Sequence, residues 1–496
     1  MKAVISLVTS LSFLLTGFMP SVYGKLAQSR PNIILVMTDD QGMGDLSCMG
    51  NQILQTPNLD RFHSQSTRFT DFQVSPTCAP TRAAMMSGRF PFEVGISHTI
   101  LQRERMALHV TTLPQALQKA GYKTGLFGKW HLGDSPEYLP QNRGFNEVLM
   151  HGAGGIGQYA YGDFKSNLKS TYFDSILLHN QKVVRSQGFC TDVFFDASIH
   201  WVKQQLNSKN PFFAYISLNA PHSPFIAPQK YKQRFLDEGY DQNTAGRYGM
   251  IENIDDNFGK LMSKLEEWQA LENTLVIFMT DNGMAMPRIK KGRQSITPFN
   301  AGLKGAKAGV DEGGTHVPAF WRWKGVLKEG HNISALTAHI DLYPTLCELA
   351  GVSIPKTRLT PNGRSLIPLL ENPKAEWKDR TLYFHRGRWD DGRWDFKERE
   401  KHRYLKCAVR TQRWRWVDNQ YLYDIQNDPF QKKNIASQHP EIMSEIRAKY
   451  DRWWDSLGPL LINEGLGNIE PEDHHFPQLE TIQLAKGKIP IYQINP

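Results

Sequence analysis

The chain has 496 residues, so it can bury a large core without stabilising cross-links. With 40% hydrophobic and 22% charged residues, its composition is that of a soluble globular protein and excludes a disordered or membrane-embedded chain. The formal net charge of +9 favours an anionic partner such as nucleic acid, anionic lipid or an acidic polysaccharide, because a basic surface concentrates negatively charged ligands.

The first 24 residues have the pattern of a secretory signal peptide. Lys2 precedes an apolar run over residues 3–18, and compact residues at 22–24 stand where a signal peptidase would cut. An N-terminal membrane anchor or a buried helix is the alternative, but the apolar run is short for spanning a bilayer. We therefore expect export to the periplasm or the extracellular space, with no stable membrane insertion after cleavage.

The cysteines do not form the pattern of a disulfide framework. They are few, scattered and odd in number, and none lies in a CxxC motif: Cys48, Cys78, Cys190, Cys347 and Cys407. Some of them could pair in an exported protein, but at least one thiol must have another fate.

Apolar runs alternate with helical patterns through the first 350 residues. Strands are predicted over residues 33–37, 123–127, 211–218 and 274–279, and helices over 56–61, 112–120, 247–271 and 343–350. Continuous apolar runs are typical of strands that are buried on both faces. The alternation predicts an α/β fold with a large mixed, mostly parallel sheet sandwiched by helices.

A Pro-rich stretch over residues 355–373 predicts a domain boundary. Beyond it, short aromatic and β-branched segments over 381–425 predict a small antiparallel sheet, and a helix over 440–457 closes it. We therefore expect a main domain over residues 25–370 and a smaller C-terminal α+β subdomain over residues 371–496.

Two pairs of oxygen ligands lie directly after predicted strands. Asp39 and Asp40 follow the first strand, and Asp281 and Asn282 follow the strand at 274–279. Open α/β sheets bind ligands beyond the carboxyl ends of their strands, and an oxygen-only set favours calcium, or magnesium as runner-up, over zinc. Both segments are also good turn formers, so either pair alone leaves the choice between metal ligation and a turn open.

The most specific motif is Cys-Ala-Pro-Thr-Arg at residues 78–82. Taken alone, Cys78 and Arg82 could be an inert thiol and a solvated cation. The whole segment resembles the signature of the type I sulfatases of the alkaline phosphatase superfamily, in which a formylglycine-generating maturation enzyme oxidises this cysteine to formylglycine. The resemblance implies that hydrated formylglycine at Cys78 is the nucleophile, because one hydroxyl can attack sulfur and the other can expel the sulfate. Arg82, one helical turn later, can point back toward it.

Further segments resemble the same family in the same order. Gly-Lys-Trp-His-Leu-Gly at 128–133 implies that Lys129 holds the sulfate and that His131 takes a proton from the second hydroxyl. Ala-Pro-His at 220–222 implies that His222 protonates the leaving alcohol. The structural alternatives are a solvated lysine and packed or loop histidines. The two acidic pairs flank the cysteine motif in the family's order, which favours a calcium site made of Asp39, Asp40, Cys78, Asp281 and Asn282.

The segment over residues 303–318 resembles the family segment that supplies a second sulfate-binding lysine. The alignment of this segment with the family pattern assigns that role to Lys307. The segment departs from the family at four positions. Lys304, Ala308, Asp311 and His316 stand where Arg, Gly, an aromatic residue and Arg are common. Lys304 therefore stays open as a substitute for Lys307.

The resemblance covers most of the mature chain, from about residue 31 to about residue 429, and implies a sulfuric ester hydrolase. Residues 377–416 hold 13 Lys and Arg against 6 Asp and Glu, interleaved with Trp389, Trp394, Trp414 and Trp416. Such a segment suggests a sulfated carbohydrate, because aromatic faces stack on sugars and basic groups pair with sulfates. The alternative is a solvated charged face with core tryptophans. No nucleic-acid fold signature is present, so we expect no nucleic-acid partner.

Two rival functions stay open at this point. A phosphate or phosphonate ester hydrolase of the same superfamily can share the Cys-x-Pro-x-Arg element. A catalytically silent glycan-binding protein could keep the fold, although every position that the family needs is filled here.

Overall fold

The computed structural model describes residues 26–169, 171–285, 288–354, 361–389, 396–464, 466 and 469–494. The predicted signal peptide, residues 1–24, lies outside this described part. Among the described residues, no helix combines the length and the apolar character that a membrane crossing needs. All five cysteines are described, and each is a free thiol.

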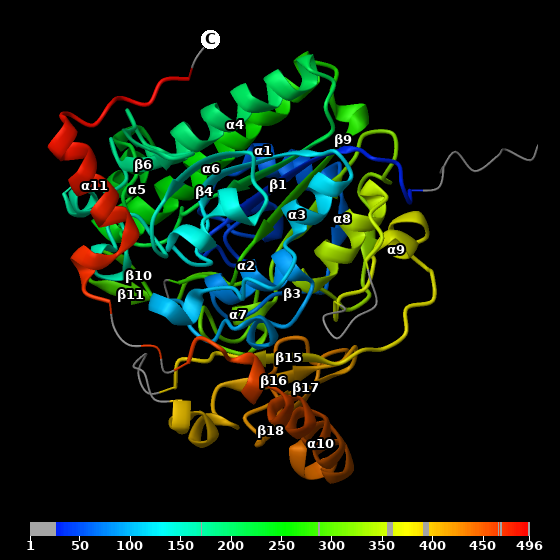
Figure 1. Cartoon of the computed structure of the whole chain (residues 1–496). Coiled ribbons are helices and arrows are strands. Elements are labelled where there is room, and N and C mark those ends of the chain that lie inside the picture. Colours follow the sequence, from blue (N-terminus) through cyan, green and yellow to red (C-terminus); the bar gives the residue numbers. More distant parts are fainter. Residues whose placement is uncertain are drawn as a thin grey trace, which may run out of the picture.

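A ten-stranded sheet forms the centre of the molecule (Figure 1). In sheet order, its strands are β13 (Asn332–Ile333), β2 (Thr67–Phe69), β12 (Ala319–Arg322), β9 (Thr274–Thr280), β1 (Asn32–Thr38), β8 (Phe212–Ser217), β4 (Lys123–Lys129), β5 (Glu147–His151), β6 (Ile176–His179) and β7 (Lys182–Arg185). The five central strands from β9 to β5 are parallel. Antiparallel strands flank them, with β12 beside β9 and with β6 and β7 beyond β5. The predicted mostly parallel sheet is confirmed.

Helices cover both faces of this sheet, because alternate side chains of its strands point to opposite sides (Figure 1). Ile33, Leu35 and Met37 of β1 share one core with α2 (Cys78–Ser87), α3 (Leu113–Lys119), α8 (Leu342–Ala350) and α9 (Ile367–Glu371). Ile34 and Val36 share the other core with α1 (Pro57–Ser64), α4 (Cys190–Asn207) and α6 (Gln242–Glu267). On this second side, α5 (Gln229–Asp237) packs against α6.

A second, four-stranded antiparallel sheet lies below the main sheet in Figure 1. It consists of β15 (Leu382–His385), β16 (Cys407–Arg410), β17 (Trp414–Val417) and β18 (Tyr421–Asp424), and α10 (Pro440–Ser456) packs into its separate core. The predicted small sheet and closing helix are confirmed. Within the stretch predicted as a domain boundary, α9 places Ile367 and Leu369 in the main core.

Shorter elements complete the chain. They are β3 (Phe72–Gln73) paired with β14 (Thr337–Ala338), β10 (Ile289–Lys291) paired with β11 (Gln294–Ile296), and α7 (Glu312–Thr315). The last helix, α11 (His475–Lys486), precedes a return to the edge of the main sheet, where Tyr492 N donates to Arg185 O at 2.8 Å.

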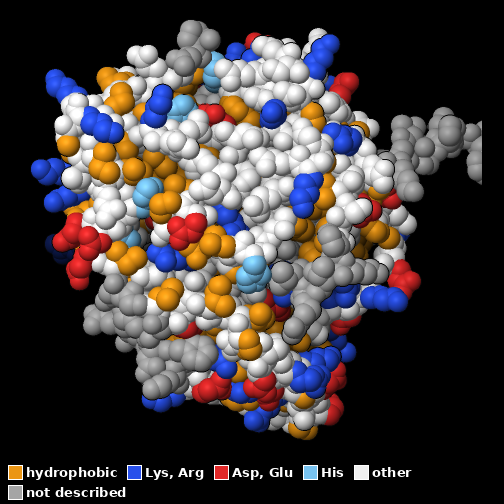
Figure 2. Space-filling model, viewed as in Figure 1, with side chains coloured by type: hydrophobic (Ala, Val, Ile, Leu, Met, Phe, Trp, Pro, Cys, Tyr) orange, Lys and Arg blue, Asp and Glu red, His pale blue; other side chains and the backbone are white. Residues whose placement is uncertain are grey.

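Several described basic residues of the segment 377–416 are paired with carboxylates. Figure 2 shows acidic and basic side chains mixed over the C-terminal sheet and α10, and Arg403 pairs with Asp451 at 3.3 Å. Trp389 and Trp416 are fully buried, so for these two the alternative of core tryptophans is what the structure shows. Trp394 lies outside the described residues.

Candidate active site

The two predicted acidic pairs meet at one edge of the sheet. Since β1 and β9 are parallel neighbours with Thr38 opposite Thr280, the residues that follow them emerge side by side. Asp40 N donates to Asp281 Oδ1 at 3.1 Å, and Asn282 Nδ2 donates to Asp40 Oδ1 at 2.9 Å. Asp39, Asp40, Asp281 and Asn282 are all buried. Residues that lie more than 240 positions apart in sequence thus form one cluster.

Cys78 is the first residue of α2 and lies against this cluster. Its side chain belongs to a group in which one ligand atom each from Asp39, Cys78 and Asp281 lie within 4.8 Å of one another. Burial raises the pKa of the thiol, but the charges of Lys129 and Lys307 outweigh burial and hold the pKa below its ordinary value. The N-terminus of α2 adds its partial positive charge. The position therefore favours a negatively charged group.

Arg82 lies one helical turn after Cys78 and is fully buried. Its guanidinium contacts Asp281 Oδ2 through Nη2 at 2.8 Å and through Nε at 3.2 Å. Its Nη1 donates to Lys129 O at 3.2 Å and to the Ser217 hydroxyl. Arg82 therefore ties α2 to the ends of β4, β8 and β9, and it supplies a fixed positive charge beside Cys78.

Lys129 and His131 stand at the end of β4. Lys129 Nζ lies 2.6 Å from Asp39 Oδ2. His131 Nε2 lies 2.9 Å from Thr99 O, and since only a protonated nitrogen bonds a carbonyl, Nδ1 carries the free lone pair in the neutral ring. That Nδ1 is buried and has no hydrogen-bond partner among the described residues. The ring therefore has a proton acceptor available.

Glu104 is a site residue that sequence reasoning missed. Its Oε2 lies 3.0 Å from His131 Nε2. Burial raises the pKa of Glu104 to about 7. Burial and Lys129 lower the pKa of His131, and Glu104 opposes them. No pattern in the Arg-Glu-Arg run around Glu104 distinguishes it from a solvated segment.

His222 and Lys307 close the cluster around Asp40. His222 Nε2 lies 3.7 Å from Asp40 Oδ2, while its Nδ1 is 2.7 Å from Ser223 O. Lys307 Nζ lies 2.7 Å from Asp40 Oδ1. Lys304 points elsewhere, since its Nζ donates to Tyr423 OH at 2.7 Å. Of the two lysines left open by the sequence, only Lys307 contacts the cluster.

The cluster has the donors that a hard cation needs. The Oδ1 atoms of Asp39 and Asn282 are buried and have no hydrogen-bond partner among the described residues. Burial would raise the pKa of Asp39, but Lys129, His222 and Arg82 hold it well below its ordinary value, so its carboxylate is charged. Two orphaned oxygens beside Cys78 and Asp281 fit Ca²⁺, which takes oxygen ligands at flexible geometry.

A second group of acidic residues lies between the C-terminal sheet and the main domain, where Asp71 and Glu312 approach His316. Here all four carboxylate oxygens accept hydrogen bonds, from Gln73, Arg410 and Arg415. His316 Nδ1 lies 3.0 Å from Glu312 Oε2. This group is an ion-pair network that joins the C-terminal sheet to the main domain, and each of its carboxylate oxygens is already bonded.

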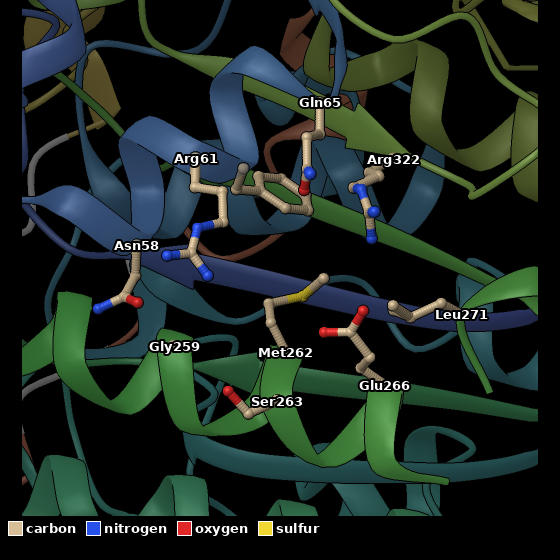
Figure 3. A pocket seen from close by; sticks show the side chains of 10 residues that line it. Asn58, Arg61, Gln65, Gly259, Met262, Ser263, Glu266, Leu271 and Arg322 are labelled. Carbon is tan, nitrogen blue, oxygen red and sulfur yellow. The ribbon is translucent and has the colours of Figure 1, made fainter. Parts of the chain in front are cut away.

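A separate pocket of about 200 Å³ lies between α1 and α6 (Figure 3). Arg61 of α1 and Gln65, which follows α1, point toward Met262 and Glu266 of α6, and Arg322 lies at one side of the pocket. The pocket is lined by none of the residues of the acidic cluster at the ends of β1 and β9.

Comparison with known proteins agrees with this geometry. A family model described as Sulfatase matches residues 31–352, and one described as N-sulphoglucosamine sulphohydrolase, C-terminal, matches residues 307–453. N-acetylgalactosamine-6-sulfatase of Canis lupus familiaris is 31% identical over 385 residues, which are 73% of this chain and 69% of that protein. The uncharacterized sulfatase YdeN of Escherichia coli K12 is 27% identical over 90% of this chain and 89% of its own length.

Solved structures give the same result. The crystal structure of Ps i-CgsB, 27% identical, superposes with a TM-score of 0.74 over 92% of this chain and 97% of its own. That protein has also been solved in complex with k-i-k-neocarrahexaose. The phosphonate monoester hydrolase of Agrobacterium radiobacter, 20% identical with a TM-score of 0.57 over 86% of this chain and 95% of its own, shares the fold alone.

Proposed function

Because this chain belongs to the sulfatase family of sulfuric ester hydrolases, we propose that it removes sulfate from a sulfated carbohydrate through a formylglycine made from Cys78. The observation that carries the proposal is the position of Cys78. It lies at the start of a buried helix, within 4.8 Å of two carboxylate ligand atoms and in the field of Lys129 and Lys307. Formylglycine there would supply a hydrated aldehyde, whose hydroxyls attack sulfur and later expel the sulfate.

Three cations of the chain would hold the sulfate. A sulfate monoester carries one negative charge, and a further charge develops on the leaving oxygen during cleavage. Arg82, Lys129 and Lys307 present fixed positive charge around Cys78, and such preorganised charge is usually the largest catalytic term. Each is held by a carboxylate, so little reorganisation is needed when the substrate binds.

Two histidines would move the protons. His131 offers the free lone pair of Nδ1 in a buried setting, so we assign it as the base that takes the proton when sulfate is expelled. The Nε2 of His222 faces Asp40 at the mouth of the cluster, so we assign it as the acid that protonates the leaving alcohol. Sugar alcohols are poor leaving groups and need this proton most.

We further propose one Ca²⁺ per chain, held by Asp39, Asp40, Asp281, Asn282 and the modified Cys78, with Mg²⁺ as the less favoured ion. When bound, the cation would stabilise negative charge on the sulfate oxygens. The donor set supports this assignment, because it contains only oxygen once Cys78 has been oxidised. Lys129 and Lys307 would keep Asp39 and Asp40 charged and oriented.

The substrate class and the location rest on separate observations. A relative that is 31% identical is named N-acetylgalactosamine-6-sulfatase, and Ps i-CgsB binds a neocarrahexaose. We therefore propose a sulfated oligosaccharide or polysaccharide as the substrate. The signal-like residues 1–24 support export to the periplasm or beyond. A catalytic domain over residues 25–370 with a C-terminal subdomain over 371–496 stays our proposal for the division of the chain.

The test is mass spectrometry of the peptide that contains Cys78, in protein produced with a formylglycine-generating enzyme, followed by sulfate release from a panel of sulfated glycans. We expect a loss of about 18 Da relative to the thiol and sulfate release that Cys78→Ala abolishes. Phosphate monoesters, phosphodiesters and phosphonate monoesters serve as competing substrates. Faster turnover of any of these than of sulfate esters would overturn the proposal, and an unmodified thiol with sugars still bound would favour a binding protein.

A further inference from the structure

The turn after β15 brings the C-terminal subdomain against the candidate active site. Arg388 N donates to Ser97 O at 3.2 Å, and Arg386 N donates to Lys406 O at 2.9 Å. Gly387 between them has a φ of +66°, and a Cβ there would lie 1.9 Å from Ser97 O, so only glycine fits this approach. Trp389 then enters the core, where its Nε1 lies 3.2 Å from Glu464 Oε2. The turn is therefore fixed on both sides.

The Arg388 side chain contacts a residue that also bonds His131. Its Nη2 donates to Thr99 Oγ1 at 2.8 Å, and the carbonyl of the same Thr99 accepts from His131 Nε2 at 2.9 Å. One residue thus separates the guanidinium from the proposed base. Burial lowers the pKa of Arg388, while the charges of Cys78 and Asp40 act in the opposite direction, which agrees with a guanidinium that faces the site.

Among the residues that the structure describes, Arg386 and Arg388 have no carboxylate partner. Within the described part of the chain, neither forms an ion pair, and the Nε of each is buried without a hydrogen-bond partner. Their charges, together with burial and Arg103, lower the pKa of His98 to about 2. By contrast, Arg82 pairs with a carboxylate at 2.8 Å. An unpaired, half-buried guanidinium is costly, and its planar fork matches an oxyanion.

We propose that Arg388, with Arg386 beside it, binds a second anionic group of the substrate, next to the sulfate ester that is cleaved. The inference rests on the proposed function and narrows the class of substrate. The substrate sugar would carry two anionic groups, the second being another sulfate ester or a uronate carboxylate. Arg388 is then a specificity residue that the C-terminal subdomain supplies to the site of the main domain.

The experiment compares wild type with Arg388→Gln on four probes. These are an aryl sulfate, a monosulfated neutral disaccharide, the same disaccharide with a second sulfate, and a monosulfated disaccharide that contains a uronate. We expect kcat/KM of Arg388→Gln to fall about 10- to 100-fold on one of the two doubly anionic sugars, mainly because KM rises. The loss of kcat/KM on the aryl sulfate should be smaller than this loss by a factor of at least about ten. Which sugar is affected identifies sulfate or carboxylate as the second group.

Matched variants separate recognition from structure. Arg388→Lys keeps the positive charge but lacks the planar guanidinium with its paired N–H donors. It should therefore bind the doubly anionic sugar more tightly than Arg388→Gln and less tightly than wild type. Arg413→Gln removes an arginine of the same subdomain that pairs with Asp424 at the surface, and it should change no probe more than about threefold. Thermal unfolding of each variant checks the fold. Equal losses of Arg388→Gln on all four probes, or no loss, would overturn the inference.

A binding measurement keeps the inference independent of turnover. Calorimetry on Cys78→Ala with the two doubly anionic disaccharides should show tight binding that Cys78→Ala combined with Arg388→Gln weakens about 10- to 100-fold. If wild type releases sulfate from no probe but this difference in affinity persists, the proposed reaction fails while the anion site stands. If the double variant binds both sugars as well as Cys78→Ala does, the anion site fails, whatever the turnover.

Discussion

The two carboxylate clusters of this molecule look alike in composition but differ in pairing. At the ends of β1 and β9, the Oδ1 atoms of Asp39 and Asn282 have no hydrogen-bond partner in the described part of the chain. Between the C-terminal sheet and the main domain, both oxygens of Asp71 and of Glu312 are bonded. Buried acceptors without partners are costly, so they persist where a ligand satisfies them. The unpaired oxygens of the first cluster therefore fit the cation that we propose, whereas the bonded oxygens of the second cluster hold the C-terminal sheet against the main domain.

The largest expected effect concerns the second cluster. Glu312→Gln leaves the buried Arg410 and Arg415 without their shared carboxylate, since both guanidinium groups contact Glu312 Oε1. We expect the free energy of unfolding to fall by about 3–5 kcal/mol, as for other broken buried ion pairs. Denaturant unfolding measures it. Glu441→Gln, at an acidic residue whose side chain is 67% exposed, is the control and should cost less than about 1 kcal/mol.

The activity of the same Glu312→Gln variant tests whether the second cluster has only a structural role. If the cluster only joins the sheets, kcat/KM of the folded enzyme should change less than about threefold. A large loss of turnover in a stably folded variant would contradict the division between the two clusters.

The second effect separates two lysines that lie three residues apart. Lys307→Met removes a cation 2.7 Å from Asp40 Oδ1, and kcat/KM should fall about 10²- to 10³-fold, as when one preorganised donor is lost. Lys304→Met removes a cation that contacts Tyr423 OH, and kcat/KM should change less than about threefold. Steady-state kinetics on an aryl sulfate decide the matter. The reverse ranking would transfer the sulfate contact to Lys304.

The third effect is a response to metal. Ca²⁺ at about 100 times its dissociation constant should stabilise the folded state by about 2.7 kcal/mol, and thermal unfolding measures it. Asp39→Asn should abolish most of this response, because Asp39 Oδ1 is an orphaned ligand. Asp71→Asn in the second cluster should leave it intact. An unchanged response in Asp39→Asn would contradict the proposal that the first cluster binds the metal. A larger stabilisation by Mg²⁺ than by Ca²⁺ would show that Mg²⁺ is the preferred ion.

The smallest effect is a shift of the pH profile. His131 must be neutral to accept a proton when sulfate is expelled, a step that follows departure of the alcohol, so kcat at saturating substrate falls as pH drops through the pKa of His131. Glu104 raises this pKa, so Glu104→Gln should move the acidic limb to lower pH and reduce kcat less than about tenfold. A pH series of initial rates checks it. A limb that moves to higher pH would mean that Glu104 acts otherwise than through His131.

The parts of the fold and the site that could be predicted share one property: their signal is local. Apolar runs such as residues 33–37 and 274–279 predict buried strands by composition alone, and the acidic residues that follow them are then placed at one sheet edge. The Cys-x-Pro-x-Arg segment is equally local. These features needed no knowledge of which distant segments come together.

What could not be predicted depends on distant partners. The sequence of α4 is rich in aromatic and β-branched residues of weak helix propensity, so its helix is set by packing against the sheet. Glu104 becomes part of the site only because His131 reaches it from β4. Arg388 lies almost 290 residues after Thr99, and a run of basic residues gives no sign of which one turns inward.

Every residue of α2 is buried, and Cys78 is only 2% exposed. The maturation enzyme that we propose could not reach this thiol once the sheet has closed, so the proposed oxidation would have to precede the end of folding. The order of synthesis provides the interval, because β9, which lies next to β1 at the centre of the sheet, follows Cys78 by about 200 residues in the chain. Under this proposal, a chain that folded faster than it was oxidised would be stable and inactive, and the rate of folding would set the yield of active molecules.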